Sequence, residues 1–471
     1  MTKSENPRYS PLLEPFEYQA VAIRRMAECN APNFDEQGLG KTKQAYDTGA
    51  HLIARNDIDL ILFIGRASLR ENLRREIVSD GKQLCVRVVR GTERQRHSIY
   101  NSLSCHVLIV SYETAVADLK VLTTLLSKYR TLICIDESHN IRNVRSKRSQ
   151  ACLHLCDRAA KTLIFSGTPA PNKTDDLYPQ LKSMGLDVGH SLAEFRTKFS
   201  EVSDLRDFLL ANSIRRTKSS IPTLQLPEKR VQRVSVPLIG TQASLYARAN
   251  EELIVELESR FGERESIPLT NVLVKLLRLV QLASNPRLLS SSFLGEPAKF
   301  LALDKLVETE LIEKNRKIII WTSFRGNVDE LAIRYAQHKP LKLYGGIGTH
   351  EKKRLLNEFQ NRDEHKVIIA IPACGREGFT FTRASTAIYV DRGFSFVDWA
   401  QSQDRIHRIS QRTECNVYVL EGAATVDLKV DDILNRKAAL QSYLLGEIET
   451  YKDPQSVSMD EALGFLRKKP G

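Results

Sequence analysis

The stretch FDEQGLGKTKQ, residues 34–44, places two glycines before a lysine and a threonine. The phosphate-loop template G-x-x-x-x-G-K-[ST] requires a further glycine where this sequence has Asp35. Gly38, Gly40, Lys41 and Thr42 do fit, and they offer flexible backbone N–H groups, a cation and a hydroxyl beside a helix N-terminus, where phosphate binds well. Taken alone, the stretch is equally consistent with a nucleotide-binding loop and with a glycine-rich turn that carries a surface lysine.

Short apolar runs separated by amphipathic, charged segments follow this stretch through both halves of the chain. Continuous apolar strands between helices are typical of parallel sheets covered on both faces. Two such sets predict an α/β protein with two lobes. The runs lie at 60–64, 107–110, 132–135 and 163–165, and again at 318–321, 367–371, 387–390 and 417–420.

A segment of different composition, about 238–289, separates the two sets and is rich in Leu, Arg and Glu at helical spacing. Within it LTNVLVKLLRLVQLA, 269–283, has apolar residues on one face, which predicts a helix of a small insertion or bridge. The last residues read as a linker and a short helix with Ser458 and Asp460 as N-caps. We expect an N-terminal lobe over 1–230, a helical bridge over 231–298, a C-terminal lobe over 299–446 and a linker with a short helix over 447–471.

Composition is that of an ordinary globular protein, because 42% of the 471 residues are apolar and 27% are charged. Lys and Arg number 69 against 57 Asp and Glu, which gives a net charge of +12. This charge suggests an anionic partner such as nucleic acid, and a solvated basic surface is the alternative. Net charge alone favours neither strongly. The first residues lack the pattern of a signal peptide, and no apolar run is long enough to span a membrane, so we expect a cytoplasmic protein. Cys152 and Cys156 have no second cluster that would complete a zinc site, so we expect core cysteines and no disulfide framework.

An acidic pair ends the apolar run in TLICIDESHN, residues 131–140. In a phosphate-loop enzyme an acid at this end of a strand holds Mg²⁺, and open α/β sheets bind ligands along that edge. Asp136 would hold the metal's hydration shell, and Glu137 could orient or deprotonate the attacking water. A strand-end acidic turn is the alternative. The run that ends in Ser166 and Gly167 follows the same pattern, and its hydroxyl groups could hydrogen-bond to the acidic pair.

Two arginines stand close together in AQSQDRIHRISQ, residues 400–411. On a helix, Gln401, Arg405 and Arg408 would share one face at i, i+4 and i+7. Arginines aimed together need anions opposite them, and a triphosphate supplies bidentate acceptors. A solvated basic helix is the alternative.

The order and spacing of these motifs resemble those of the SNF2-type members of helicase superfamily 2, which are two-lobed, ATP-driven DNA translocases. The similarity covers about residues 10–440. In the first half the similar segments are FEYQ (16–19, the adenine-reading segment), DEQGLGKT (35–42, motif I), DESHNIRN (136–143, motif II) and SGTPAPNKTDDLY (166–178, motif III). Six further segments continue the series: the exit from the first lobe at 213–238, the bridging helix at 273–289, motif IV at 318–331, its following segment at 344–359, motif V at 374–382 and motif VI at 401–411.

The resemblance implies two RecA-like parallel-sheet lobes with a small helical insertion between them, and a DNA-stimulated ATPase that uses ATP and Mg²⁺. Asp is common in the family where the general template has its first glycine. Lys41 would bind the β- and γ-phosphates, Thr42 and Asp136 the Mg²⁺ through water, and Glu137 the attacking water. Gln19 would read the adenine, with Gly38 and Gly40 in the binding loop. Arg405 and Arg408 would be arginine fingers that Gln401 helps to position, so that hydrolysis is fast only when the lobes close.

The sequence departs from the family pattern at Arg66, Arg376, Ser410 and the stretch 393–396, which lie on or near the surfaces expected to meet nucleic acid or coupling loops. The expected partner is double-stranded or branched DNA, with Arg142, Arg145, Lys147 and Arg148 as candidate phosphate contacts. The alternatives are a strand-separating DNA or RNA helicase and an ATP-dependent clamp or scaffold that recruits partners. By analogy we expect a minimal bacterial or phage enzyme of replication, repair or defence, associated with the nucleoid and directed by a partner protein or by DNA structure.

Overall fold

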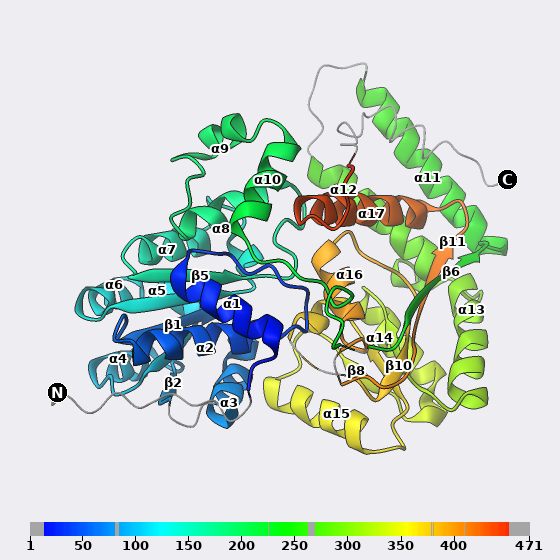
Figure 1. Cartoon of the computed structure of the whole chain (residues 1–471). Coiled ribbons are helices and arrows are strands. Elements are labelled where there is room, and N and C mark those ends of the chain that lie inside the picture. The colour runs from blue at the N-terminus through cyan, green and yellow to red at the C-terminus, as the bar shows by residue number, and fades with distance from the viewer. Residues whose placement is uncertain are drawn as a thin grey trace. The chain divides into compact units, whose positions relative to one another are not determined.

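The computed structural model describes residues 14–80, 84–224, 226–261, 269–377, 379, 381–408 and 410–451. The chain divides into two compact units, each with its own parallel sheet (Figure 1). The first unit comprises Met1–Leu224 with Lys437–Tyr451, and the second comprises Gln225–Arg436 with Lys452–Gly471. The boundaries expected at 230, 298 and 446 stay predictions, and the short C-terminal helix with Ser458 and Asp460 lies outside the described residues.

The first sheet has the order β2-β3-β1-β4-β5, and all its strand pairs are parallel. Four of its strands were predicted from apolar runs and are confirmed, whereas β2 is too short and too exposed to produce such a run. The central strands are buried on both faces, which is why they read as continuous apolar runs. The strands are β1 (Leu60–Gly65), β2 (Val86–Val88), β3 (Val107–Ser111), β4 (Thr131–Asp136) and β5 (Lys161–Phe165).

Helices cover both faces of this sheet, with α1, α2 and α3 on one face and α5, α6 and α7 on the other (Figure 1). Each connection between parallel strands must cross over the sheet, and α3 to α7 lie in those connections, whereas α1 and α2 precede β1 and α8 to α10 follow β5. The helices of this unit are α1 (Glu17–Glu28), α2 (Lys41–Ala54), α3 (Arg70–Asp80), α4 (Glu93–Asn101), α5 (Tyr112–Ala117), α6 (Leu119–Lys128), α7 (Lys147–Cys156), α8 (Tyr178–Ser183), α9 (Leu192–Lys198) and α10 (Val202–Asn212).

The second sheet has the order β6-β11-β10-β7-β9-β8 and is also parallel throughout. Alternate residues of β7 enter different clusters: Ile319 and Trp321 pack on one face and Ile318 and Ile320 on the other. The four predicted strands are confirmed, and β6 and β8 are additional. The strands are β6 (Lys229–Val236), β7 (Lys317–Trp321), β8 (Leu341–Leu343), β9 (Val367–Ala370), β10 (Ala384–Tyr389) and β11 (Cys415–Gly422).

The segment between the two sets of strands forms the long helices α11 and α12, so the helix predicted over 269–283 is confirmed. Helix α17 begins in the second unit, and its residues from Lys437 on belong to the first unit, where Leu440 and Leu444 join the apolar core. The helices are α11 (Gly240–Phe261), α12 (Leu269–Ser284), α13 (Ala298–Val307), α14 (Arg325–Arg334), α15 (Thr349–Asn361), α16 (Phe396–Gln403) and α17 (Val426–Leu444).

All eight cysteines fall within the described residues, and none of them forms a disulfide bond. Cys152 and Cys156 are buried on α7, as expected of core cysteines. Among the described residues no group of His, Cys, Asp and Glu side chains could hold a metal ion by itself. No helix in the part of the chain that the structure describes combines the length and the apolar character needed to cross a bilayer.

Candidate functional site

The segment before the glycine loop runs beside β5. Asn33 forms a parallel bridge with Phe165, and its backbone N donates to Ile164 O at 3.0 Å. Phe165 in turn lies opposite Asp136, the last residue of β4. The loop therefore leaves the sheet at the level where the acidic pair ends the neighbouring strand, and this register brings two distant motifs to one edge of the first unit.

The loop turns into α2 through two glycines with positive φ, Gly38 at 92° and Gly40 at 74°. A Cβ on Gly40 would lie 2.3 Å from Gln19 Nε2, so a larger residue at this position would have to displace the Gln19 amide. Helix α2 begins at Lys41, and its first turn presents backbone N–H groups that an anion can accept. Gly38 and Gly40 are thus required by geometry at the start of a 14-residue helix.

Lys41 folds back over the loop, where its Nζ donates to the carbonyl oxygens of Asp35 at 2.7 Å and Glu36 at 3.2 Å. Burial lowers the pKa of Lys41, and the nearby carboxylates of Glu137 and Asp35 oppose that shift. A buried cation of this kind gains from an additional anion. Gly167 lies beside the Lys41 side chain: a Cβ added at Gly167 would lie 3.5 Å from Lys41 Nζ.

Gln19 is buried on α1 and contacts the loop. Its Nε2 donates to Leu39 O at 3.2 Å, and its Oε1 accepts from the backbone N of Phe16 at 3.1 Å. Tyr18 Oη also donates to Leu39 O at 3.2 Å. The structure therefore brings Gln19 beside the glycine loop, with its amide bonded to the loop backbone.

Asp136 and Glu137 lie at the carboxyl end of β4. Gln37 Nε2 donates to Glu137 Oε1 at 3.1 Å, which connects the loop directly to the second acid. Glu137 Oε2 lies 3.3 Å from Nδ1 of His139, which contacts Ser166 Oγ at 3.1 Å. The hydroxyl of the SGT segment thus reaches the acidic pair through an imidazole, whereas the sequence suggested a direct contact.

Burial raises the pKa of the Asp136 carboxyl, and the neighbouring Glu137 raises it further, while Lys41 lowers it. The protein alone therefore does not fully offset the cost of burying the Asp136 carboxylate, and a bound divalent cation would stabilise this negative charge. Mg²⁺ is commonly held by one or two protein oxygens together with substrate phosphates and water. Thr42, in the first turn of α2, and Asp136 fit that donor set.

In the second unit the prediction of a helix over 400–411 is wrong, because α16 ends at Gln403. Arg405 and Arg408 lie in the turn that follows, so they do not share a helix face with Gln401. Arg405 is fully buried, and it donates from Nε to Gln401 O at 2.8 Å and from Nη1 to Phe379 O at 3.0 Å. Arg408 is half-buried, with Nε donating to Asp404 O at 3.0 Å.

Sequence reasoning missed Gln37, His139 and Arg216 as parts of the first unit's site. Arg216 forms an ion pair with Asp35, the residue that stands where the template has glycine. A polar side chain inside the loop and the basic run at 213–218 were the available signals. Neither signal indicates which residue is contacted, because Gln37 and Glu137 are 100 residues apart in the chain and Asp35 and Arg216 are 181 residues apart.

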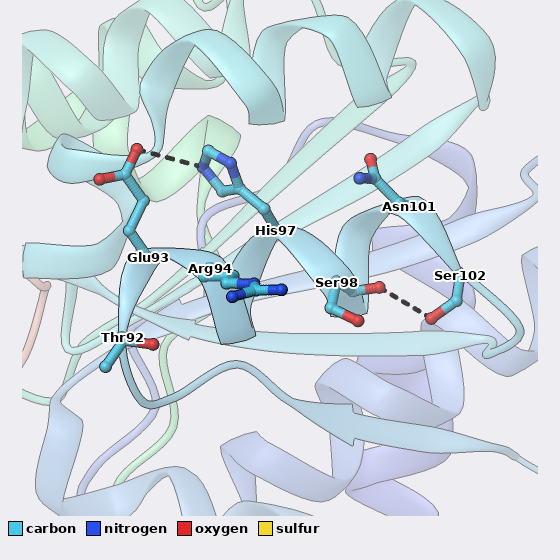
Figure 2. A pocket seen from close by; sticks show the side chains of 7 residues that line it. All are labelled: Thr92, Glu93, Arg94, His97, Ser98, Asn101 and Ser102. Carbon is cyan, nitrogen blue, oxygen red and sulfur yellow. Dashed lines mark hydrogen bonds and ion pairs between the residues drawn. The ribbon is translucent and has the colours of Figure 1, made fainter.

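A separate, open hollow of about 840 Å³ lies along the outer side of α4 (Figure 2). Its lining is polar and includes His97, which lies 3.9 Å from Glu93, and Ser102, which donates to Ser98 O at 2.8 Å. None of the loop or strand-end residues described above takes part in it. This hollow therefore contributes nothing to the site at the edge of the sheet.

A glycine loop that leads into a helix N-terminus, with an acidic pair at the end of a nearby parallel strand, defines the first unit as a phosphate-loop α/β fold. The model of the SNF2-related domain matches residues 18–288, and that of the helicase conserved C-terminal domain matches residues 298–410. The chain belongs to the SNF2-related domain family.

Two curated relatives illustrate the similarity. YwqA of Bacillus subtilis, whose name describes an ATP-dependent helicase/translocase, is 26% identical over 434 residues, which cover 87% of this chain and 46% of the relative. The human DNA annealing helicase and endonuclease ZRANB3 is 24% identical over 454 residues, which cover 90% of this chain and 40% of the relative. The chain thus spans less than half the length of either relative.

Among solved structures, the SWI2/SNF2 ATPase core of Sulfolobus solfataricus in complex with dsDNA aligns with a TM-score of 0.43 and 24% identity. The alignment covers 92% of this chain and 95% of that structure.

Proposed function

We propose that the chain is an ATP-driven translocase or remodelling enzyme that hydrolyses ATP to ADP and phosphate and moves along duplex or branched DNA. The observation that carries this proposal is the convergence of Lys41, Asp136 and Glu137 at the carboxyl edge of the first sheet, beside the N-terminus of α2. The family and the names of the relatives support ATP use, and the name of the human relative supports DNA as the substrate.

In this proposal Lys41 exchanges its carbonyl partners for the β- and γ-phosphates, while the backbone N–H groups around Gly38 and Gly40 donate hydrogen bonds to the remaining phosphate oxygens. Glu137, oriented by Gln37, positions and deprotonates the attacking water. Thr42 and Asp136 would hold Mg²⁺, which when bound neutralises phosphate charge.

Gln19 would read the adenine through the amide that now contacts the loop. Arg408 and Arg405 would supply guanidinium groups from the second unit, with Gln401 holding their turn in place through its carbonyl bond to Arg405. An arginine that stabilises the transition state of phosphoryl transfer contributes about 10³ to 10⁵ in rate.

DNA would bind chiefly through its phosphates, because exposed basic residues follow the acidic pair. Arg142, Arg145 and Lys147 are exposed, and Arg148 is partly exposed. Phosphate contacts of this kind are tolerant of sequence and sensitive to salt. Such an enzyme would work at the nucleoid, directed by a partner protein or by DNA structure.

Phosphate release measured with duplex, forked and single-stranded DNA and with RNA tests the proposal. We expect duplex or forked DNA to stimulate release, and Lys41→Ala to abolish it. Glu137→Gln should retain ATP binding and lose about 10² to 10⁴ in rate, because the general base is removed. Glu93→Gln, the same change on the exposed face of α4, is the control and should hydrolyse ATP normally (Figure 2).

Hydrolysis that no polynucleotide stimulates would contradict the proposal. Displacement of a third strand from a duplex, compared with opening of a forked duplex, separates translocation from strand separation. A protein that binds DNA and hydrolyses ATP without either activity would instead be a clamp or scaffold.

A further inference from the structure

The backbone of Glu137 adopts a left-handed conformation with φ of 51°, which is unfavourable for a residue with a Cβ. Its carbonyl oxygen accepts three hydrogen bonds: from Asn140 Nδ2 at 2.7 Å, from the Asn140 backbone N at 2.9 Å and from Tyr112 Oη at 3.2 Å. Tyr112 Oη also donates to the carbonyl of Asp136 at 2.6 Å. Two side chains outside the acidic pair therefore maintain the conformation that aims its carboxylates.

The same two side chains line a basic hollow of about 500 Å³ on the first unit. Arg142, Lys147 and Arg148 contribute its positive charge. The guanidinium of Arg148 lies 5.3 Å from the centre of the Tyr112 ring. One wall of this hollow is thus formed by the residues that hold the Glu137 carbonyl.

We propose that this hollow binds backbone phosphates of DNA and that Tyr112 and Asn140 are positioning residues that transmit its occupancy to Glu137. This inference rests on the proposed function, because it assigns the place where DNA would influence ATP hydrolysis. The ligand chemistry is a phosphodiester, which three clustered cations and the Asn140 amide can contact.

The physical basis is the ion pair between Arg148 and Glu113 at the edge of the hollow. In this structure Arg148 Nη2 donates to Glu113 Oε1 at 2.8 Å on the exposed side of the hollow. A phosphate in the hollow competes with Glu113 for that guanidinium and fixes it over the Tyr112 ring, which steadies the hydroxyl that holds Asp136 and Glu137. Coupling of two ligands through one element is reciprocal, so nucleotide bound at Lys41 changes the DNA affinity by the same factor by which DNA changes the nucleotide affinity.

Tyr112→Phe tests the connection, because it removes the hydroxyl and keeps the ring under Arg148. We expect the factor by which duplex DNA stimulates phosphate release to fall by about fivefold or more. The DNA dissociation constant without nucleotide should stay within about twofold of the wild-type value, since no phosphate contact is removed. The effect of a non-hydrolysable ATP analogue on that constant should shrink as well, by the same factor as the effect of DNA on the affinity for the analogue.

Tyr100→Phe is the matched control, because Tyr100 is also buried in the first unit and its hydroxyl donates to Asp118 Oδ2 at 2.8 Å, away from the acidic pair. It should retain full stimulation. If Tyr112→Phe unfolds at a markedly lower temperature than Tyr100→Phe, Asn140→Ser provides the second measurement with the same expected loss of stimulation.

The inference is overturned if Tyr112→Phe and Asn140→Ser keep the wild-type stimulation factor, or if Arg148→Gln leaves DNA affinity unchanged. Inorganic phosphate that activates hydrolysis as well as duplex DNA would also overturn it, since the site would then serve the free anion. Failure of the proposed function is a different result, in which DNA does not stimulate the wild-type protein at all.

Discussion

Arg216 donates from Nε and Nη2 to the two carboxylate oxygens of Asp35, at 3.0 and 2.5 Å. Asp35 is fully buried at the start of the glycine loop and also accepts from Gln44 Nε2 at 3.2 Å. The guanidinium of Arg216 lies 5.1 Å from the centre of the Tyr18 ring. One arginine from the end of the first unit's main segment therefore fixes both the loop and α1. A loop with glycine at position 35 would lack this anchor.

Asp35→Ala should lower the free energy of unfolding of the first unit by about 3 kcal/mol, because it leaves the Arg216 charge partly buried without its partner. Urea denaturation followed by circular dichroism measures this change. ATP binding should weaken as well, since the loop loses its anchor.

The control for Asp35→Ala is Arg55→Ala, which removes the exposed ion pair between Arg55 and Asp57. Exposed pairs contribute little, so stability should hardly change. If both variants lower the free energy of unfolding equally, the buried Asp35–Arg216 pair contributes no more to stability than an exposed pair.

Gly40→Ala should raise the KM for ATP, because the added Cβ would lie 2.3 Å from Gln19 Nε2 and displace the amide that is proposed to read the adenine. Steady-state kinetics provide the measurement. A stability loss of about 1 to 2 kcal/mol should accompany it, since φ at this position is 74°.

Gly185→Ala isolates the backbone effect. Gly185 has φ of 68° and no atom within 4 Å of the added Cβ, so it should lose similar stability and keep its KM. A KM that rises equally in both variants would assign the effect to instability and not to the loop.

Arg405→Ala and Arg408→Ala should have different effects. Arg405 is fully buried, so its removal leaves the carbonyls of Gln401 and Phe379 without these bonds and should lower the melting temperature of the second unit. Arg408 is only half-buried, so its removal should leave the melting temperature nearly unchanged.

In DNA-stimulated hydrolysis Arg408→Ala should lose about 10³-fold in kcat if it contacts the transferring phosphate. Arg408→Lys should recover little, because an ammonium lacks the planar fork of donors. Wild-type kcat in Arg408→Ala would remove this residue from the proposed chemistry.

The combined substitution Arg142→Gln and Arg145→Gln should flatten the dependence of DNA affinity on salt. Each phosphate contact contributes about 0.9 to the slope of log affinity against log salt, so losing two should reduce the slope by nearly 2. Fluorescence anisotropy over a salt series checks this. Arg94→Gln, on α4, should keep the wild-type slope (Figure 2). Identical slopes for all three proteins would count against the assignment.

Local pattern was sufficient to predict the two parallel sheets, the glycine loop and the helix α12. Each buried strand is apolar along its whole length, and the glycines of the loop are required by backbone geometry at their own positions. Strand β6 escaped notice because it is a basic edge strand whose residues are mostly exposed, so it has no apolar run. The helix expected over 400–411 failed because spacing alone does not show that α16 ends at Gln403.

The sequence by itself determined which residues carry charge and which segments are buried, since those properties depend on residue type and its period along the chain. Only the tertiary structure decided which of them meet. The contacts of Gln37 with Glu137, of Arg216 with Asp35 and of Tyr112 with the strand-end carbonyls join segments 24 to 181 residues apart. Such contacts depend on strand order and register, which bring the ends of parallel strands to one edge and leave no periodic signal in the chain.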